Sequence, residues 1–354
     1  MKAMVLHNID DFRLETVEEP RFKEGEVLVE VKAAGICGSD IPRVYYTGTY
    51  SYPLIPGHEF SGVVIAAGSH ADTNWKGKRV GVFPLIPCHD CAPCQNKQYE
   101  MCRHYSYLGS RRAGAFAEYV AVPEENLLEL PDCVSFEQAA MLEPMAVAVH
   151  AMRRVSLLPT DTVAVCGLGT IGLLLVMFLR EAGMKNILVI GNKDGHKRMA
   201  RELGITEEAY CDSRMIKTEE WLLEKTDGTG ADVFFECVGK RETVAQAVNI
   251  TAPGGRICLV GNPASDIMLE REVYWKILRN QMTLTGTWNS SFTQETGDDW
   301  HYVLERLVSN RITPEKIISH RFSLEELMQG FHIMRDKTED YGKIMCVIKK
   351  NKKF

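Results

Sequence analysis

The sequence lacks the long hydrophobic runs of a membrane protein. Its longest apolar stretch, residues 171–179, covers nine residues, whereas a helix needs about 20 apolar residues to span a bilayer. The first seven residues, Met-Lys-Ala-Met-Val-Leu-His, are too polar for a secretion signal. We therefore expect a protein of the cytoplasm that neither spans nor binds a membrane.

The chain also lacks a surplus of charge of either sign. Its formal net charge is −6, and 25% of its residues are charged. Proteins that bind nucleic acids usually carry strongly basic surfaces, so this mildly acidic composition argues against a nucleic-acid partner. The length of 354 residues exceeds what one ordinary hydrophobic core supports, which predicts two domains.

Cysteine, in contrast, is plentiful: the chain contains 11. Without an export signal, this number indicates a reducing compartment, where thiolates bind metal rather than form disulfides. Four of them lie close together, at Cys88, Cys91, Cys94 and Cys102. This spacing is typical of structural zinc in a closed site of four thiolates. The alternatives are disulfides or ordinary buried thiols.

The order of short apolar segments predicts an α/β protein with two different domains. The first 145 residues are rich in β-segments, including residues 27–31, 62–65 and 79–82. After Glu143-Pro144, apolar strands alternate with helices. The predicted strands are residues 162–166, 187–190, 232–235, 256–260 and 283–286, and the predicted helices are 171–182, 197–203, 218–225 and 243–250. This alternation indicates a parallel sheet covered on both faces. The part after about residue 287 ends in an apolar strand, 343–348, and we expect it to return to the first domain.

A glycine motif, Gly167-Leu168-Gly169-Thr170-Ile171-Gly172, lies between the first of these strands and a helix. This is the context that a dinucleotide-binding motif requires. The first glycine permits a tight turn, the second lets the backbone approach a pyrophosphate, and the third lets the helix pack on the strand. The alternative is a tight turn without a ligand. The predicted cofactor contacts are Gly167, Gly169, Thr170, Ile171 and Gly172, with Val238, Val260 and Gly261.

The end of the next strand indicates which cofactor is preferred. An NAD site has an acidic residue there, about 20 residues after the motif, that accepts hydrogen bonds from the adenosine ribose. This chain has Gly191-Asn192-Lys193, followed by several basic residues. We therefore predict a preference for NADP, with Gly191, Asn192 and Lys193 at the site. Two alternatives are that these residues only open a solvated helix, or that Asp194 serves NAD.

Several segments together connect the chain to a known family. They are Gly-Ile-Cys-Gly-Ser-Asp at 35–40, Gly-His-Glu-Phe-Ser-Gly at 57–62, the four-cysteine segment, Glu143-Pro144 and the glycine motif. With these segments the whole chain resembles the zinc-containing medium-chain alcohol and polyol dehydrogenases. The resemblance implies a GroES-like catalytic domain, residues 1–148 and 289–354, and a Rossmann domain, residues 149–288, with a zinc in the cleft between them. It also implies a homodimer or homotetramer that associates through the edge strand 283–286.

The same resemblance implies a catalytic zinc held by Cys37, His58 and Glu143, and hence two zinc ions per chain. Glu59 would be either a further ligand or a close neighbour. One thiolate, one imidazole and one carboxylate leave a position open on zinc, where an alcohol becomes more acidic and can lose hydride to a nicotinamide. Ser39 matches the hydroxyl that relays the alcohol proton in the family. The alternative for Ser39 is a hydroxyl that caps a turn.

The substrate implied is a secondary alcohol of a sugar alcohol or sugar-alcohol phosphate. Arginine pairs well with phosphate, which makes Arg43, Arg111 and Arg112 candidate phosphate ligands, although arginines in such loops are often solvated or paired with acids. Tyr45, Tyr50 and Trp288 are candidates for the pocket wall, or else plain core. The alternatives are a neutral polyol, butanediol or threonine as substrate, and, less favoured, a non-catalytic protein that binds zinc and dinucleotide.

Overall fold

The computed structural model describes residues 1–349 and divides the chain into two compact units. Unit 1 holds Met1–Pro144 and the described residues from Ser291 onward, and unit 2 holds Met145–Ser290. The first division falls inside helix α4 (Leu142–Arg153). Among residues 1–349, no helix is long and apolar enough to cross a membrane.

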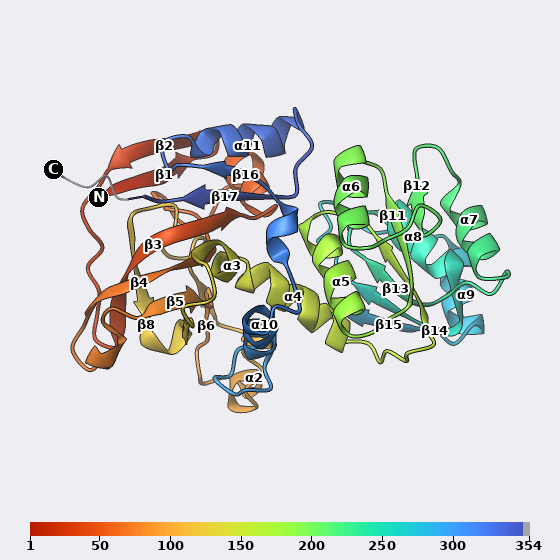
Figure 1. Cartoon of the computed structure of the whole chain (residues 1–354), viewed down its shortest axis with the longest axis horizontal. Helices are drawn as coiled ribbons and strands as arrows, with labels where there is room; N and C mark the ends of the chain where they lie inside the picture. Colours follow the sequence, from red (N-terminus) through yellow and green to blue (C-terminus); the bar gives the residue numbers. More distant parts are fainter. Residues whose placement is uncertain (350–354) are drawn as a thin grey trace. The chain divides into compact units, whose positions relative to one another are not determined.

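Unit 2 is built on a six-stranded sheet in which all neighbouring strands are parallel (Figure 1). Its spatial order is β12 (Tyr210–Asp212), β11 (Asn186–Gly191), β10 (Thr162–Cys166), β13 (Ala231–Glu236), β14 (Thr251–Leu259) and β15 (Thr283–Gly286). Numbered along the chain, this is the order 3-2-1-4-5-6 of a Rossmann fold. The predicted doubly wound parallel sheet is therefore confirmed.

The helices of unit 2 connect these strands. They are α5 (Thr170–Glu181), α6 (Asp194–Glu202), α7 (Thr218–Lys225), α8 (Arg241–Ile250) and α9 (Arg271–Arg279). Apolar residues of α5 from Leu173 to Leu179 are buried, and those of β10, β13 and β14 form the facing core. Two elements were not predicted from the sequence, β12 and α9. The first has three residues, too few to show a hydrophobic period. The second carries an amphipathic pattern, with Val273 and Ile277 packed against the core, that was missed in the sequence.

Unit 1 is a β-rich unit around a seven-stranded sheet (Figure 1). The strands in order are β16 (Ile318–Phe322), β17 (Lys343–Val347), β3 (Glu26–Ile36), β4 (Glu59–Ala67), β5 (Arg79–Val82) and β9 (Leu127–Glu129), with β8 (Tyr119–Pro123) paired to β3. Two further pairs are β1 (Lys2–Asn8) with β2 (Asp11–Thr16), and β6 (Leu85–Ile86) with β7 (Ser106–Tyr107). The helices are α1 (Asp40–Pro42), α2 (Ala92–Gln95), α3 (Phe136–Ala140), α10 (Asp299–Val308) and α11 (Leu327–Asp336).

The central strands of unit 1 bring distant parts of the chain together at one edge. In β3, Gly35 lies opposite Glu59 of β4, and Ile36 lies opposite Ile344 of β17. The residues just past these pairs, Cys37 and His58, therefore come close to each other and to Lys343. A Cβ atom on Gly35 would lie 2.2 Å from Oε2 of Glu59. Glycine at this position therefore leaves space for the charged group beside it.

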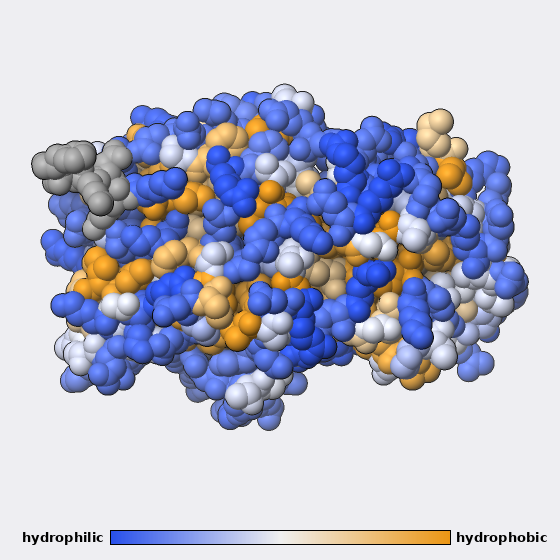
Figure 2. All heavy atoms as spheres, in the orientation of Figure 1, coloured by the Kyte–Doolittle hydropathy of each residue, from blue (hydrophilic) through white to orange (hydrophobic). Residues whose placement is uncertain are grey.

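The surface mixes polar and apolar side chains. Figure 2 shows hydrophilic residues over most of the face in view, with hydrophobic residues exposed in separate patches. Several large apolar side chains on α9 and β15 of unit 2 are among the exposed ones, including Trp275, Leu278 and Leu284. These two elements lie at one end of the sheet order, where β15 has a neighbour on one side only.

Candidate metal and cofactor sites

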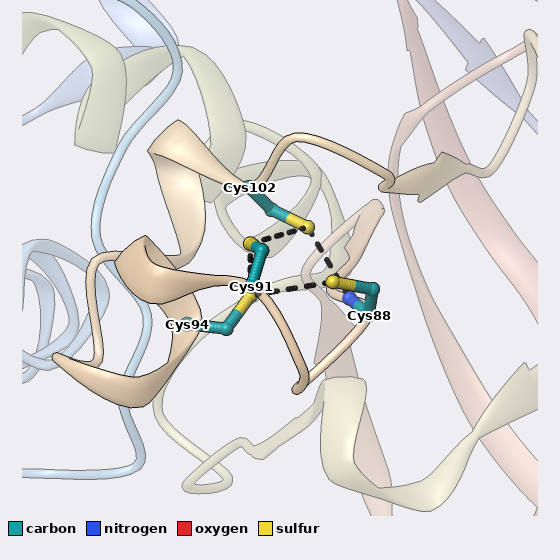
Figure 3. Close-up of side chains that lie close together, drawn as sticks. All are labelled: Cys88, Cys91, Cys94 and Cys102. Carbon is teal, nitrogen blue, oxygen red and sulfur yellow. Dashed lines mark hydrogen bonds between the residues drawn. The ribbon is translucent and has the colours of Figure 1, made fainter.

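The four cysteines of the segment 88–102 point toward one another on one loop around α2 (Figure 3). Their sulfur atoms lie within 4.8 Å of one another, with separations of 3.5 Å for Cys91 and Cys94, 3.9 Å for Cys91 and Cys102, and 4.0 Å for Cys88 and Cys94. Four thiolates at about 2.3 Å from a tetrahedral zinc are about 3.8 Å apart. All 11 cysteines are free thiols. The geometry fits a four-thiolate zinc site and contradicts the disulfide alternative.

Backbone groups of the same loop stabilise negative charge on two of the sulfurs. Backbone N–H groups of Arg103 and Cys94 lower the pKa of Cys91 to about 6, and those of Asp90 and Cys91 lower the pKa of Cys88. Burial instead raises the pKa of Cys94 to about 12. The loop therefore holds at least two sulfurs ready to ionise, as metal binding requires.

The second cluster combines three ligand types at the edge of the central sheet. Ligand atoms of Cys37, His58 and Glu59 lie within 4.8 Å of one another. His58 is 4% exposed, and its Nδ1 has no hydrogen-bond partner among the described residues. Asp40 Oδ1 lies 3.6 Å from this nitrogen. Burial lowers the pKa of His58, but the negative charges of Asp40 and Cys37 outweigh burial and raise it well above its ordinary value. The cluster therefore favours a positive charge, and this donor set fits a zinc ion.

Glu59 forms a buried ion pair with Lys343. Lys343 Nζ donates to both carboxylate oxygens of Glu59, at 2.8 and 2.5 Å, and to the carbonyl oxygen of Ile36 at 3.1 Å. Both side chains are almost fully buried. Removal of one partner of such a buried ion pair strongly destabilises the fold, because the other charge is left unpaired.

Glu143 lies at the start of α4 and has a different partner. The hydroxyl of Tyr107 donates to Glu143 Oε1 at 3.2 Å, and the Tyr107 ring packs edge-on against His58, with ring centroids 5.6 Å apart. Burial raises the pKa of Glu143 to about 7, although the positive charge of His58 opposes this rise. Glu143 thus lies beside the cluster and is held by one hydrogen bond, whereas Glu59 is held by an ion pair.

The turn after Cys37 contains two residues, Ser39 and Asp40, that form hydrogen bonds with Cys37. Asp40 is fully buried, accepts a hydrogen bond from the Cys37 backbone N–H at 3.0 Å, and pairs with Arg43 at 2.5 Å. The hydroxyl of Ser39 donates to Cys37 Sγ at 3.3 Å. Ser39 therefore lies beside the sulfur of Cys37. It makes no side-chain hydrogen bond as N-cap of α1, the alternative considered above.

The glycine motif has the conformation that its sequence predicts. Gly167 has φ +92°, and a Cβ on Gly172 would lie 2.0 Å from the Gly167 carbonyl oxygen. A Cβ on Gly169, in contrast, would meet no described protein atom within 4 Å, so contacts within the fold do not explain this glycine. Gly169 is the N-cap of α5, where free N–H groups favour a phosphate.

Three further predicted cofactor contacts lie at the adjacent strand ends. Val238 follows β13 and would touch a Cβ on Gly167, at 2.6 Å from its Cγ2 atom. Val260 and Gly261 follow β14, and both backbone N–H groups donate to the Glu236 carbonyl oxygen at 2.8 Å. Because β10, β13 and β14 are neighbours in the sheet, their carboxyl ends meet at the switch point where dinucleotides bind.

At the end of β11, Gly191 lies beside a group of polar residues, of which only Asp194 was singled out from the sequence. Asp194 pairs with Arg214 at 2.5 Å, and Arg214 also pairs with Asp212 at 2.6 Å. Backbone and side chain of Ser213 both donate to the Gly191 carbonyl oxygen, at 2.9 and 3.2 Å. Asp194, the alternative acceptor for NAD, is therefore already bound to a guanidinium group.

The predicted substrate residues fall into two groups. Arg43 pairs with Asp40, Arg112 pairs with buried Glu26 at 2.8 Å, and Tyr45 is part of the unit 1 core. Arg111 stacks between Tyr50 and Tyr105, with its guanidinium carbon 4.4 and 4.3 Å from the two ring centroids. Tyr50 and Trp288 are exposed, at 72% and 57%. Of the three arginines, only Arg111 has no carboxylate partner among the described residues.

Tyr105 and Tyr107 connect Arg111 with the second cluster. The ring of Tyr105 contacts Arg111 on one side and Tyr107 on the other, with centroids 6.1 Å apart, and Tyr107 contacts His58. Neither tyrosine was predicted as a site residue, and neither was Asp40 or Lys343. Asp40 is the last residue of the segment 35–40, and Tyr105 and Tyr107 follow the four-cysteine segment closely. For Lys343 the sequence offers no signal beyond its place at the start of the predicted strand 343–348.

Comparison with known proteins identifies both parts of the chain. Residues 23–132 match the alcohol dehydrogenase GroES-like domain, and residues 170–309 match the zinc-binding dehydrogenase family. Galactitol 1-phosphate 5-dehydrogenase of Escherichia coli K12 is 32% identical over 331 residues, which cover 93% of this chain and 95% of that protein. Sorbitol dehydrogenase of Bacillus subtilis is 31% identical over 333 residues, covering 92% and 91%.

The similar solved structures are also dehydrogenases. The crystal structure of galactitol-1-phosphate dehydrogenase from E. coli matches with a TM-score of 0.91 at 31% identity, covering 98% of this chain and all of that one. A zinc-binding dehydrogenase of Sinorhizobium meliloti bound to NADP matches at 0.88 with 28% identity, covering 98% of each chain. An alcohol dehydrogenase of E. coli CFT073 in complex with NADH matches at 0.89 with 27% identity, covering 98% and 99%.

Proposed function

This chain belongs to the zinc-containing alcohol and polyol dehydrogenases, which are NAD(P)-dependent oxidoreductases, and on that premise we propose its reaction. It transfers a hydride between a secondary alcohol of a sugar alcohol or sugar-alcohol phosphate and NADP or NAD, as in the conversion of galactitol 1-phosphate to tagatose 6-phosphate. The observation that carries this proposal is the close approach of the ligand atoms of Cys37, His58 and Glu59, which lie within 4.8 Å of one another.

We propose that Cys37, His58 and Glu143 hold the catalytic zinc, while the four-cysteine loop holds a second, structural zinc. The support for Glu143 over Glu59 is the difference between their partners. Lys343 engages both oxygens of Glu59 in a buried ion pair, whereas one hydrogen bond from Tyr107 leaves Glu143 able to offer an oxygen. Glu59 then acts as a neighbouring negative charge that Lys343 balances.

In the reaction, zinc would supply Lewis acidity to the alcohol oxygen, and the nicotinamide would accept the hydride. The residues of the chain orient these groups and move a proton. Asp40 fixes the Cys37 backbone and lies next to His58, with Arg43 balancing its charge. The hydroxyl of Ser39, beside Cys37, would relay the alcohol proton: it accepts this proton and passes its own on towards the nicotinamide ribose.

We infer a preference for NADP from the end of β11. Residues 191–193 are Gly-Asn-Lys and offer no carboxylate to the adenosine ribose, and the next acidic residue, Asp194, is bound to Arg214. A guanidinium near this strand end also suits a 2′-phosphate. NADP and NADH each accompany a similar solved structure, so the preference rests on the residues of this chain.

A phosphorylated substrate is supported by the similarity to galactitol-1-phosphate dehydrogenase and by Arg111, the one candidate arginine without a carboxylate partner in residues 1–349. Its contacts through Tyr105 and Tyr107 lead to His58. A neutral polyol is the second candidate. The ion pairs of Arg43 and Arg112 favour it, because they remove two of the three predicted phosphate ligands.

We also propose that two copies of the chain associate through β15. This strand ends the sheet, and Leu284 on it and Leu278 on the neighbouring α9 are exposed apolar residues that association would bury. Light scattering of the purified protein gives the oligomeric state directly, and a monomer would refute this part of the proposal.

The direct test of the reaction is a panel of sugar alcohols and their phosphates, each assayed with NAD and with NADP. We expect oxidation of a polyol or polyol phosphate at a secondary carbon, with higher kcat/KM for NADP. Activity confined to neutral polyols would favour the second candidate. No activity with any polyol or polyol phosphate would contradict the proposal.

A further inference from the structure

The adenosine end of the cofactor site contains a buried hydroxyl that no group of the protein satisfies. Tyr210 in β12 is 4% exposed, and its hydroxyl oxygen has no hydrogen-bond partner among the described residues. A buried hydroxyl without a partner destabilises the folded chain, because it has lost its water and gained nothing in return. Such a group is available to accept a partner from outside the protein, and its place in the fold decides whether a ligand can supply one.

The place of this hydroxyl gives the class of the missing partner. It lies against Gly191, since a Cβ added to that glycine would be 2.6 Å from the Tyr210 oxygen. Gly191 ends β11, the strand whose carboxyl end meets the adenosine ribose in a Rossmann fold. An acidic side chain at 191, as in an NAD site, would therefore collide with the tyrosine. This chain has a hydroxyl donor where an NAD site has a carboxylate acceptor.

We propose that the Tyr210 hydroxyl donates a hydrogen bond to the 2′-phosphate of NADP, which makes Tyr210 a specificity-determining residue of the cofactor site. This inference deepens the proposed function and rests on its nicotinamide-dinucleotide site. A phosphate oxygen is the better acceptor than a ribose hydroxyl, because a hydrogen bond to a charged group is the stronger one.

The charges around Tyr210 fit this role. The Lys197 ammonium lies 5.2 Å from the centroid of its ring. Ser213 binds the Gly191 carbonyl and so places Arg214 at the same strand end. Two acidic groups, Asp194 and Asp212, are also present, and both are bound to Arg214. The guanidinium offsets one of these two negative charges and so weakens the repulsion that a phosphate meets at this position.

The test is the substitution Tyr210→Phe, which removes the hydroxyl and keeps the ring. NADPH and NADH are titrated separately by fluorescence, without any substrate. We expect the Kd for NADPH to rise about tenfold, as for the loss of a hydrogen bond to a charged group, while the Kd for NADH stays within about twofold. Tyr46→Phe, an exposed tyrosine of unit 1, is the matched control and should change neither Kd.

A second measurement separates this role from a structural one. Without cofactor, Tyr210→Phe should unfold at the same temperature as the wild type or higher, because it removes a buried hydroxyl without a partner. The rise in unfolding temperature caused by NADPH should shrink, and the rise caused by NADH should not. A lower unfolding temperature without cofactor would overturn the inference.

The other possible results of the two titrations also test the inference. If the variant changes both Kd values equally or neither, the inference is wrong even if the wild type prefers NADPH. If the wild type prefers NADH but the variant weakens only NADPH binding, the inference stands and the proposed preference fails. If the wild type binds neither nucleotide, the proposed function fails and the inference falls with it.

Discussion

The two thiolate-containing sites of unit 1 differ in how their ligands are supplied. In the four-cysteine loop all the sulfurs come from residues 88–102. Their separations suit the four ligands of a tetrahedral zinc. The Cys37 cluster draws its groups from segments that lie far apart in the chain. It places a thiol, an imidazole and carboxylates side by side, and each contacts further polar residues: Ser39, Asp40, Tyr107 and Lys343.

Under the proposed zinc assignments, this difference separates a structural site from a catalytic one. Four thiolates complete the coordination of zinc and leave no position for a substrate. Cys37, His58 and one carboxylate leave a position open, and their neighbours orient the ligands and hold charges that a closed site does not need. Substitutions in the two sites should therefore affect different properties of the protein.

The largest effect is expected for His58→Ala. Loss of a catalytic zinc ligand removes a Lewis acid worth several kcal/mol, so kcat/KM should fall about a thousandfold or more. Circular dichroism and the unfolding temperature should stay near those of the wild type. The control His70→Ala changes an exposed histidine and should keep full activity. An active His58→Ala enzyme would contradict the catalytic role of the Cys37 cluster.

Cys91→Ser should act in the opposite way. The loop loses a thiolate and its zinc, so the unfolding temperature should fall by about 10 °C or more, while protein that remains folded keeps its activity per molecule. Differential scanning calorimetry measures the shift. Cys133→Ser, at an exposed cysteine outside both clusters, is the control. An unchanged unfolding temperature in Cys91→Ser would remove the structural role of this loop.

Ser39→Ala sharpens the distinction within the catalytic cluster. If Ser39 relays the proton, kcat should fall about a hundredfold, with zinc content unchanged and activity restored in Ser39→Thr. Loss of zinc in Ser39→Ala would instead mean that its hydrogen bond to Cys37 is what matters. Ser69→Ala, at an exposed position, serves as control.

The smallest effect is expected for Arg111→Ala. Loss of a guanidinium that binds phosphate should raise KM for a polyol phosphate about tenfold and leave KM for sorbitol unchanged. Arg13→Ala, an exposed arginine on β2, is the control. Equal changes in KM for both substrates would show that Arg111 supports the fold through its tyrosine contacts and does not recognise phosphate.

The sequence predicted well what is encoded locally. The four cysteines lie in one short segment. The glycine motif lies between a strand and a helix that both follow clear hydrophobic patterns. The strands β10 and β15 have the predicted bounds. The Rossmann sheet followed from the alternation of such segments. Local spacing carries this information because neighbouring residues define the turn or the metal site by themselves.

The rest depends on contacts between distant residues. Lys343 and Glu59 are 284 positions apart, and the strand pairing of β3 with β4 and β17 brings them together. Tyr210 lies on a three-residue strand too short to show a hydrophobic period. The local sequence also left open whether Tyr45 and Arg112 face a substrate. The structure shows the alternatives considered for them, since Tyr45 lies in the core and Arg112 pairs with Glu26.

The most direct test of the two-site account is the zinc content per chain, measured by plasma mass spectrometry on wild type and variants. The account predicts two zinc ions in the wild type and in Glu59→Gln. It predicts one in His58→Ala and Glu143→Gln, retained by the cysteine loop, and one in Cys91→Ser, retained by the catalytic cluster. A wild type with fewer than two, or a His58→Ala variant that keeps both, would contradict it.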